Sequence, residues 1–257
     1  ASDVYKRQGR GRGLIMGGGA PAPTSIEYIQ IQSAGTGIDF GDLTGTMKWN
    51  SGGASSTRGL SIGGNDPVID TIEYVTIATT SNAIDFGNLT VARLDAETVS
   101  NGSRMVTYAG SLPSSTNGSN TMDYITIAST GNATNFGDLL TGNHNGGSCS
   151  PGVYGYFIGG DSTPYTPNNS NVIQRITIQT TGNSTDVGDL TFLRNSNSGA
   201  ANDSRGISAG GQSVWPYNND GNLNQIEYFD AAGGGGDSSD FGDLATRVQQ
   251  ASGMSGQ

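Results

Sequence analysis

Short runs of alternating apolar and polar residues recur along this chain, and no segment of ten or more residues carries the apolar stripe of an amphipathic helix. Residues 72–77, IEYVTI, are rich in β-branched and aromatic side chains, as are residues 26–31, 122–127, 173–178 and 226–229. Runs of this kind suit a pleated, half-buried surface. Each is accompanied by three more, which in the second unit are residues 59–62, residues 89–93 and the small-residue stretch 96–103. The pattern therefore predicts four short strands in each unit.

Two markers show that the unit is repeated five times. A glycine pair, which allows the positive φ of a tight turn, begins in successive copies at Gly17, Gly63, Ala109 (alanine for the first glycine), Gly159 and Gly210. These positions are 46, 46, 50 and 51 residues apart. A Phe-Gly-Asp marker begins at Phe40, Phe86, Phe136, Val187 and Phe241, in steps of 46, 50, 51 and 54 residues. Such a period indicates a solenoid, a propeller or an array, and four strands per copy favour the propeller.

The order of these features resembles the kelch repeat, whose units form the blades of a β-propeller. In kelch units a glycine pair ends the second strand, a tyrosine lies in the third strand and a tryptophan in the fourth. Gly63, Gly64, Tyr74 and Phe86 match these places, with phenylalanine in place of tryptophan. The resemblance covers about residues 9–257 and implies an all-β, kelch-like propeller with five visible repeats of about 46–54 residues.

Some copies depart from the kelch pattern. Copy four has Tyr154 where the other copies have an arginine, Arg175 where they have tyrosine, and Val187 where they have phenylalanine. The near-identical units of the form I-[ED]-Y-[IV]-T-I-A also resemble the kelch-like proteins that marine bacteriophages encode, which are often described as virion structural proteins.

Residues 1–8, ASDVYKRQ, lie outside the repeat and resemble the translated end of a sequencing adapter, as an assembled environmental sequence would carry. We exclude them from the fold. Residues 9–257 are expected to form one propeller domain, with repeats at about 12–57, 58–103, 104–152, 153–204 and 205–257. The first repeat begins at a second strand and residues 248–257 match a first strand, so the two ends could complete one blade and close a ring of five. A larger propeller is the alternative.

Composition and charge exclude several classes of function. Only 33% of the residues are hydrophobic and 42 are glycine, which suits thin sheets joined by tight turns. The net charge is −10, and Lys6 and Lys48 are the only lysines, so the surface would repel the phosphates of nucleic acid. No apolar run approaches the roughly 18 residues of a membrane span. We therefore expect neither a nucleic acid partner nor insertion into a membrane.

Residues that commonly carry catalysis are scarce. Cys149 and His144 are the only cysteine and the only histidine, and both lie in the loop sequence GNHNGGSC. A nucleophile needs a base that a third group orients, and a metal site needs several ligands. We therefore expect no enzyme activity, no metal site and no cofactor. Calcium binding by the turns at residues 39–42 and 132–138 stays open, because their oxygen donors suit calcium but also favour turns.

An arginine and an acidic or amide residue recur at fixed places in the repeat. The arginines are Arg12, Arg58, Arg104 and Arg205, and the second set is Asp42, Asn88, Asp138, Asp189 and Asp243. A ring of arginines could bind an anion such as sialic acid. Because functional residues should break a repeat pattern, we expect both sets, like Gly63 and Gly64, to be structural. The simplest arrangement pairs arginine with aspartate within or between blades, or caps turns with them.

The loop after the glycine pair does break the pattern. It has 7 residues in copies one and two, and then 11, 12 and 14 residues. The long loops carry Tyr165 in copy four and Trp215 and Tyr217 in copy five. Aromatic rings beside amides and carboxylates are typical of sugar-binding surfaces, although surface loops also tolerate insertions that have no function. These three aromatic residues are the candidate ligand-binding residues, and we expect them on one rim of the disc.

The sequence favours a non-catalytic protein of a phage virion or tail appendage, located in the virion or outside the cell. It would bind host-surface glycans or other virion proteins through its blade loops. Two alternatives stay open: a secreted or periplasmic carbohydrate-active protein, and a bacterial kelch-type scaffold for protein interactions.

Overall fold

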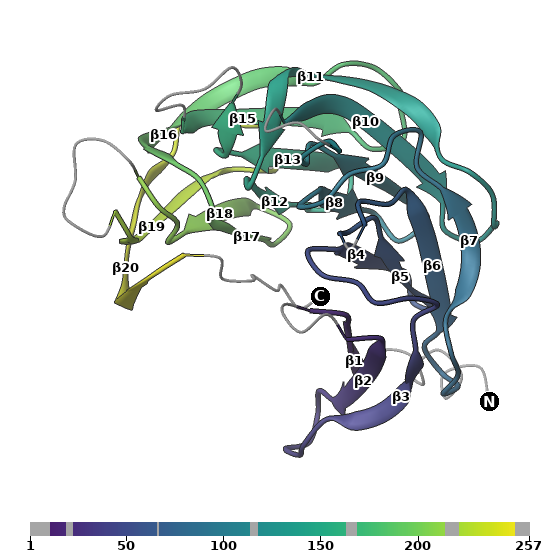
Figure 1. The fold of residues 1–257 in the computed structure, drawn as a ribbon. Helices are drawn as coiled ribbons and strands as arrows, with labels where there is room; N and C mark the ends of the chain where they lie inside the picture. The colour runs from purple at the N-terminus through teal and green to yellow at the C-terminus, as the bar shows by residue number, and fades with distance from the viewer. Residues whose placement is uncertain are drawn as a thin grey trace.

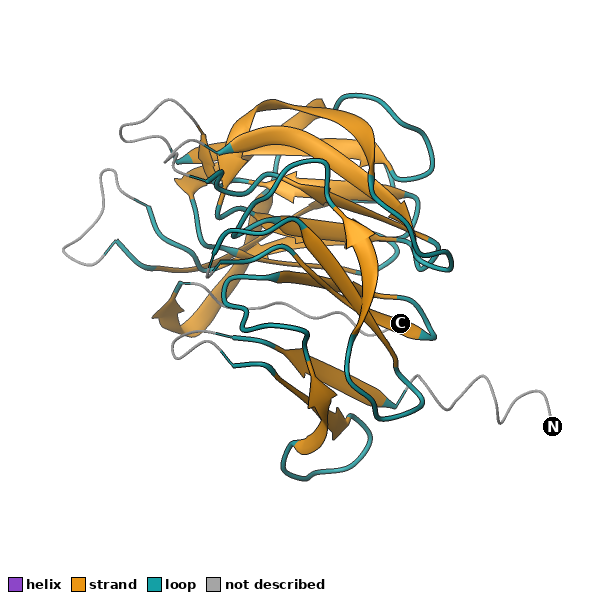
Figure 2. Cartoon of the chain, turned by 45° about the vertical axis from the view of Figure 1, so that its right-hand side comes forward, coloured by secondary structure: helices purple, strands orange, loops and turns teal. Residues whose placement is uncertain are grey.

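The structure is a computed structural model that describes residues 11–18, 23–65, 67–113, 118–162, 169–213 and 221–249. These residues form five antiparallel sheets around a common axis, the blades of a propeller (Figure 1). Strands and loops account for all of them (Figure 2). No helix long and apolar enough to cross a membrane occurs in the described part of the chain. The predicted all-β propeller is confirmed.

Each blade is a meander in which neighbouring strands follow one another in the chain. Blade 1 contains β1 (Arg12–Met16), β2 (Ser25–Gln30) and β3 (Ile38–Asp42). Blade 2 contains β4 (Ser51–Ala54), β5 (Arg58–Ile62), β6 (Thr71–Thr76) and β7 (Ile84–Asn88). Blade 3 contains β8 (Glu97–Ser100), β9 (Arg104–Tyr108), β10 (Ser119–Thr126) and β11 (Thr134–His144), with β14 (Asp161–Ser162) on its edge. Blade 4 contains β12 (Gly147–Cys149), β13 (Tyr154–Ile158), β15 (Ser170–Thr177) and β16 (Thr185–Arg194), and blade 5 contains β17 (Ser198–Ala201), β18 (Arg205–Ala209), β19 (Leu223–Asp230) and β20 (Ser239–Val248).

The blades are offset from the sequence repeats. The first repeat supplies β1 to β3 of blade 1 and then β4, the innermost strand of blade 2. Because the strands alternate in direction, the loops after the glycine pairs and the connections between blades emerge on one face, which we call the loop face. The tight turns within each blade lie on the opposite face, the turn face.

The apolar core is divided among the spaces between adjacent blades, where four clusters of buried side chains lie. Between blades 2 and 3, for example, Leu60 and Phe86 pack with Met105 and Ile125. The repeated tyrosine and phenylalanine of one blade meet edge to face, as Tyr74 and Phe86 do with ring centroids 5.8 Å apart. Because each blade covers its neighbour, small side chains and thin sheets suffice to build a core.

The Phe-Gly-Asp marker is the point at which one blade receives the next. Gly87 has a φ of 143°, and a Cβ there would collide with the backbone of Gly131. Gly131 lies in the turn between β10 and β11, and we call this turn of each blade its corner. The residue after Gly87 bonds the same corner through its main chain: Asn88 N donates to Asn132 Oδ1 over 3.1 Å, and Ala133 N donates to Asn88 O over 2.8 Å. The same pair of bonds occurs at Asp42, Asp138 and Asp189.

The repeated arginines also face the neighbouring blade, on the turn face. Arg58 lies over the ring of Tyr74, 4.5 Å from its centroid, and donates to the carbonyl of Ile127 in blade 3 over 2.7 Å. Arg12 and Arg104 make the corresponding contacts with Ile77 and Ile178. The expected pairing of arginine with aspartate is wrong, because no ion pair among the described residues joins the two repeated sets. The arginines reach the neighbouring blade from the face of a ring to a carbonyl, and the aspartates bond that blade through their main chain.

Copy four reaches the same arrangement with the two residues exchanged. Arg175 lies 4.7 Å from the ring centroid of Tyr154 and donates to the carbonyl of Gly234 in blade 5 over 2.6 Å. Because residue 175 is arginine and not tyrosine, a phenylalanine at position 187 would have no ring to meet. Val187 occupies that position instead. The three departures of copy four, Tyr154, Arg175 and Val187, therefore belong to one exchange of the tyrosine and the arginine.

We expect Arg58→Ala to lower the free energy of unfolding by about 1–3 kcal/mol, because the carbonyl of Ile127 loses its charged donor. Arg205 provides the matched control. It lies 4.5 Å from the ring centroid of Tyr228, as Arg58 does from Tyr74, but the described residues offer it no neighbouring carbonyl. Arg205→Ala should therefore cost only the exposed ring contact, about 0.5–1 kcal/mol. Urea denaturation measures both variants, and equal losses would contradict the role of the carbonyl.

The arginine that closes a repeat is a different residue with a buried partner. Arg93 and Arg194 are fully buried and form ion pairs with Asp123 and Glu227 of the following blade. Arg247 of copy five does not stand at this point, although it is one residue away in the chain. Val248 holds the equivalent position, because its carbonyl accepts from Gly211 N as the carbonyl of Arg194 accepts from Gly160 N.

Candidate binding site in the central channel

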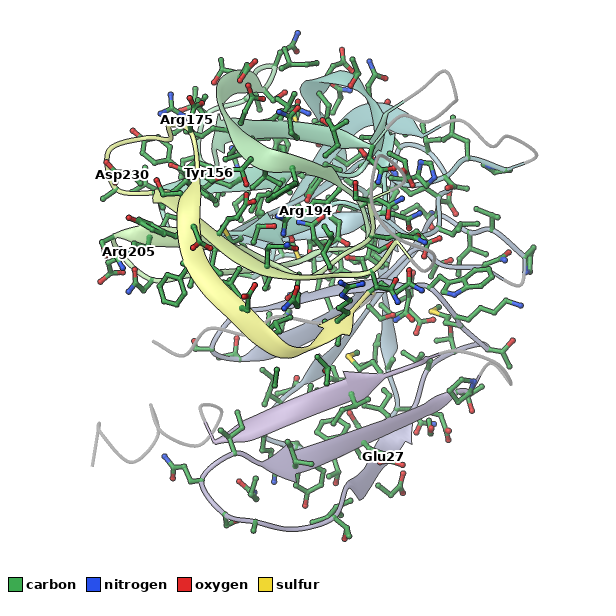
Figure 3. The ribbon with its side chains drawn as sticks, turned by 90° about the vertical axis from the view of Figure 1, so that its left-hand side faces the viewer. Glu27, Tyr156, Arg175, Arg194, Arg205 and Asp230 are labelled. Atoms are coloured by element: carbon green, nitrogen blue, oxygen red, sulfur yellow. The ribbon has the colours of Figure 1, made fainter. Side chains whose placement is uncertain are left out.

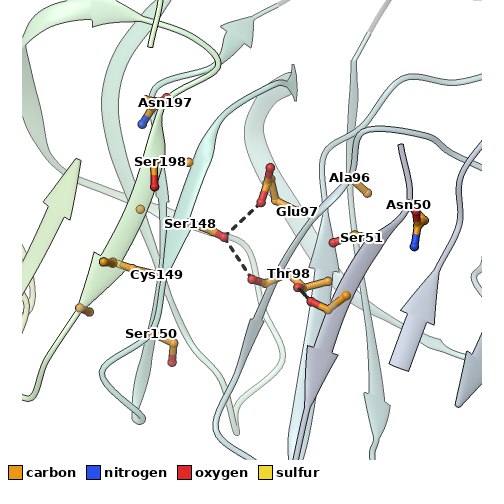
Figure 4. A pocket seen from close by; sticks show the side chains of 15 residues that line it. Asn50, Ser51, Ala96, Glu97, Thr98, Ser148, Cys149, Ser150, Asn197 and Ser198 are labelled. Atoms are coloured by element: carbon orange, nitrogen blue, oxygen red, sulfur yellow. Dashed lines mark hydrogen bonds between the residues drawn. The ribbon is translucent and has the colours of Figure 1, made fainter. Parts of the chain in front are cut away.

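The innermost strands β4, β8, β12 and β17 line a cavity of about 430 Å³ on the propeller axis (Figure 4). Most lining side chains are small or carry a hydroxyl, such as Ser51, Thr98 and Ser148. Two of these hydroxyls bond the preceding blade: Thr98 Oγ1 donates to Gly52 O over 2.5 Å, and Ser148 Oγ lies 3.2 Å from Thr98 O. The channel is therefore a polar cavity with rigid walls.

Glu97 is the one charged residue among the described side chains that line this cavity. Alignment of the first strands gives Ser51, Gly147 and Ser198 at the same position, so Glu97 breaks the repeat. Ser148 Oγ lies 3.2 Å from Glu97 Oε2, within hydrogen-bonding distance (Figure 4). Burial raises the pKa of Glu97 to about 8; the hydrogen bond with Ser148 opposes this shift and the charge of Asp95 adds to it. Glu97 is thus mostly protonated at neutral pH.

Asp95 belongs to the connection that precedes β8, on the loop face. It has a φ of 50°, and Trp49, Asn145 and Ser196 hold the same left-handed conformation in the other connections. Burial raises the pKa of Asp95 to about 6. Asp95 N donates to the carbonyl of Trp49 over 3.0 Å, and the Trp49 ring is 51% exposed. Asp95 and Trp49 thus lie in neighbouring connections of the loop face, and each directly precedes a residue that lines the cavity, Ala96 and Asn50.

The long loops start from the same face. Asp161 pairs with His144 of β11 in the sheet register, and its Oδ1 accepts from Asn195 Nδ2 over 2.7 Å. Asn169, at the far end of the same loop, donates through Nδ2 to the carbonyl of Gln212 over 2.7 Å. The ends of the loops of blades 4 and 5 are thus joined. Tyr165, Trp215 and Tyr217 themselves lie outside the described residues.

His144 and Cys149 lie in different blades and have different surroundings. Cys149 is buried in β12, and burial raises the pKa of its thiol to about 12, so it carries no thiolate at neutral pH. His144 Nε2 lies 3.6 Å from Asp161 Oδ2, and burial lowers the pKa of His144 against the charge of that carboxylate. No group of three or more His, Cys, Asp or Glu side chains is placed to hold a metal ion within the described ranges.

Sequence reasoning missed Glu97 because it treated residues 96–103 as one small-residue strand. The available signal was positional, since aligning that strand in four copies leaves one carboxylate among serine and glycine. Asp95, two residues before Glu97 in the chain, was missed as well, and its charge acts on Glu97. Tyr154 and Arg175 also break the repeat, but they keep the contact between ring and guanidinium.

No protein family model matches the sequence, and no curated protein matches it. Among solved structures, the chain is similar to the one described as "Structure of YjhT", with a TM-score of 0.76. The sequence identity is 10%, and the match covers 95% of this chain and 84% of the other. At this identity the likeness concerns the fold alone.

Proposed function

We propose that the chain is a non-catalytic binding propeller of the kelch-like, phage-appendage type, which holds a neutral host-surface glycan at the loop face. The observation that carries the proposal is Glu97, a carboxyl group that breaks the repeat among the residues lining the axial cavity. The protein would act in the virion or outside the cell, where such glycans are found.

The chemistry of the cavity suits a sugar. Its volume of about 430 Å³ lies within the usual range for sites that hold small molecules. Hydroxyls and peptide groups on the walls can exchange hydrogen bonds with sugar hydroxyls, and a protonated Glu97 both donates and accepts. The exposed ring of Trp49, which precedes the lining residue Asn50 in the chain, would offer a flat apolar surface on the loop face. The net charge of −10 disfavours anionic ligands.

The long loops extend this proposal. Their joined ends at Asn169 and Gln212 emerge on the same face as the mouth of the channel. Tyr165, Trp215 and Tyr217 would then add aromatic contacts outside the channel, and such residues commonly supply much of the binding energy of an interface.

A carbohydrate-active enzyme is the second candidate, and one observation favours it. The pKa values of Asp95 and Glu97, about 6 and about 8, are separated as those of a general acid and a general base often are. Catalysis by two carboxyl groups requires further groups that orient them. Among the described residues, Glu97 has only the hydrogen bond with Ser148 for this purpose, so the non-catalytic function is preferred. A protein-interaction scaffold would not require a carboxyl group inside the channel.

Binding and turnover measurements separate these functions. On an array of neutral and acidic oligosaccharides at pH 7, we expect the chain to bind neutral glycans. Glu97→Leu should weaken this binding at least tenfold, because the polar groups of the cavity wall lose the carboxyl group as a hydrogen-bond partner. Glu97→Gln should bind within about twofold of the wild type, because the amide, like a protonated carboxyl group, both donates and accepts. The tenfold loss expected for Glu97→Leu corresponds to about 1.4 kcal/mol of binding free energy. The control is Glu27→Gln, which changes an exposed carboxylate of blade 1.

Two further outcomes would change the assignment. Turnover of a bound sugar that Glu97→Gln abolishes would replace the binding function by the enzymatic one. Binding that Trp215→Ala and Tyr217→Ala abolish together, while Glu97→Leu leaves it intact, would place the glycan on the loops and not in the channel.

A further inference from the structure

Each of the four contacts between successive blades is built from the same parts. We call the sheet face that looks toward the following blade its trailing face, and the face that looks toward the preceding blade its leading face. A trailing face supplies a guanidinium, a buried phenylalanine or the partly buried Val187, and the glycine that receives the next corner. A leading face supplies a carbonyl, apolar side chains and a buried polar residue, which are Ile127, Ile125 and Asp123 in blade 3.

The trailing face of blade 5 carries this complete set of parts, and no blade among the described residues covers it. Phe241 is 50% exposed, whereas Phe40, Phe86 and Phe136 are each 2% exposed. Gly242 has a φ of 137° and no neighbour within 4 Å of a Cβ position, although the equivalent glycines contact the next corner closely. Arg205 is held over Tyr228 in the pose that Arg58 uses to reach a neighbouring carbonyl. This surface has the form of one half of a blade contact.

The leading face of blade 1 is the other half. Ile29 and Ile31 are 36% and 64% exposed, while their counterparts in the other four blades are buried. Ile15 is 50% exposed, and Glu27 is exposed where blades 2 to 5 bury Glu73, Asp123, Gln174 and Glu227. One part differs: Thr36 stands where Asn82 accepts a bond from the preceding blade, and it offers a hydroxyl oxygen instead.

Within the part of the chain that the structure describes, the two faces do not meet. Figure 1 shows an opening between β20 and blade 1, and Figure 3 shows Arg205 of blade 5 and Glu27 of blade 1 apart from each other on that side. Their chemistry is nevertheless complementary, because a cationic, aromatic face opposes an aliphatic face that bears a carboxylate. Both also continue a type of contact that the chain already makes four times.

We propose that the trailing face of blade 5 binds the leading face of blade 1 of a second copy, so that molecules associate head to tail. Phe241 would cover Ile29 and Ile31, and Arg205 would donate to the carbonyl of Ile31, as Arg58 does to that of Ile127. Contacts of this heterologous kind close into a ring or extend into a filament, according to the rotation between copies. The inference concerns assembly and does not depend on the glycan proposed above.

Two single variants test it with the full chain. Phe241→Glu damages only the trailing face, and Ile31→Glu damages only the leading face. In sedimentation velocity, the wild type should associate in a concentration-dependent manner, and each variant alone should be monomeric. An equimolar mixture of the two should form a 1:1 dimer that grows no further, because each variant keeps the face that the other lacks. Ile84→Glu is the matched control, since Ile84 is 56% exposed but lies on neither face.

The remaining outcomes would overturn the inference. A wild type that stays monomeric at every concentration would do so. So would a mixture of the variants that fails to dimerise, which would place any self-association elsewhere. A monomer whose amides near Phe241 and Ile31 are protected from hydrogen exchange would mean that the chain closes upon itself. Circular dichroism confirms that each variant keeps its sheets, as expected for changes at exposed positions.

Discussion

Replacing Arg194 by methionine should lower the free energy of unfolding by about 3–5 kcal/mol, the usual cost of breaking a buried ion pair. Arg194 and Glu227 are fully buried at the contact of blades 4 and 5, and Arg194 Nη2 donates to Glu227 Oε1 over 2.7 Å. Arg194 Nη1 also donates to the carbonyl of Gly210 over 3.2 Å. Without the guanidinium, the carboxylate of Glu227 would remain buried beside hydroxyl and amide donors alone.

The repeat itself supplies the control for this experiment. Between blades 3 and 4 the same two positions are held by Asn143 and Gln174, a neutral pair, and Gln174 Oε1 accepts from Leu140 N over 3.0 Å. The double variant Arg194→Met with Glu227→Gln should therefore recover most of the lost stability in urea denaturation. If the double variant is as unstable as the single one, the cost comes from lost packing of the arginine stem and not from the uncompensated charge.

The contact of blades 1 and 2 is a natural example of the single replacement. Met47 takes the place of the arginine there, and Glu73 has no cationic partner in the described structure. Burial raises the pKa of Glu73, which the hydrogen bond from Thr44 opposes. The buried acid at this contact thus tolerates the missing arginine by holding its proton more tightly.

The fold could be predicted from the sequence because one contact is repeated. The Phe-Gly-Asp marker recurs because each glycine receives the corner of the next blade, so a local sequence reports a contact between blades. Paired substitutions are harder to read. Tyr154 and Arg175 lie on neighbouring strands, and a comparison of single positions reads their exchange as two losses although the contact between ring and guanidinium persists.

The candidate site was less predictable, because it depends on register and burial. Whether Arg247 or Val248 closes copy five depends on one residue of register in β20, and only the bond from Gly211 N decides it. Glu97 can be noticed in the sequence, but its unusual proton affinity arises from four innermost strands that meet at the axis. A residue's distance from that axis does not follow from its position in the repeat alone.

The final prediction uses that proton affinity. Because the pKa of Glu97 is raised from 4.5 to about 8, the folded chain binds this proton more tightly than the unfolded chain does. The stability that Glu97 contributes is therefore complete below pH 4.5 and is lost as the pH rises to about 8. One such proton changes the free energy of unfolding by at most about 1.4 kcal/mol per pH unit. Between pH 6.5 and 8 the wild type should lose stability at a slope that is close to this limit near pH 6.5 and about half of it at pH 8.

Glu97→Gln should remove this slope, because the amide cannot ionise. Asp95, with a pKa of about 6, produces a similar loss mainly below pH 6, and the lowered pKa of His144 acts in the opposite direction below pH 6.5. The interval from pH 6.5 to 8 therefore isolates Glu97. Urea midpoints should diverge there, with Glu97→Gln the more stable protein at pH 8, while Glu27→Gln follows the wild type. Parallel curves for Glu97→Gln and the wild type would show that the channel is wet enough to leave Glu97 with an ordinary pKa, and would remove the basis for a protonated carboxyl group in the proposed binding site.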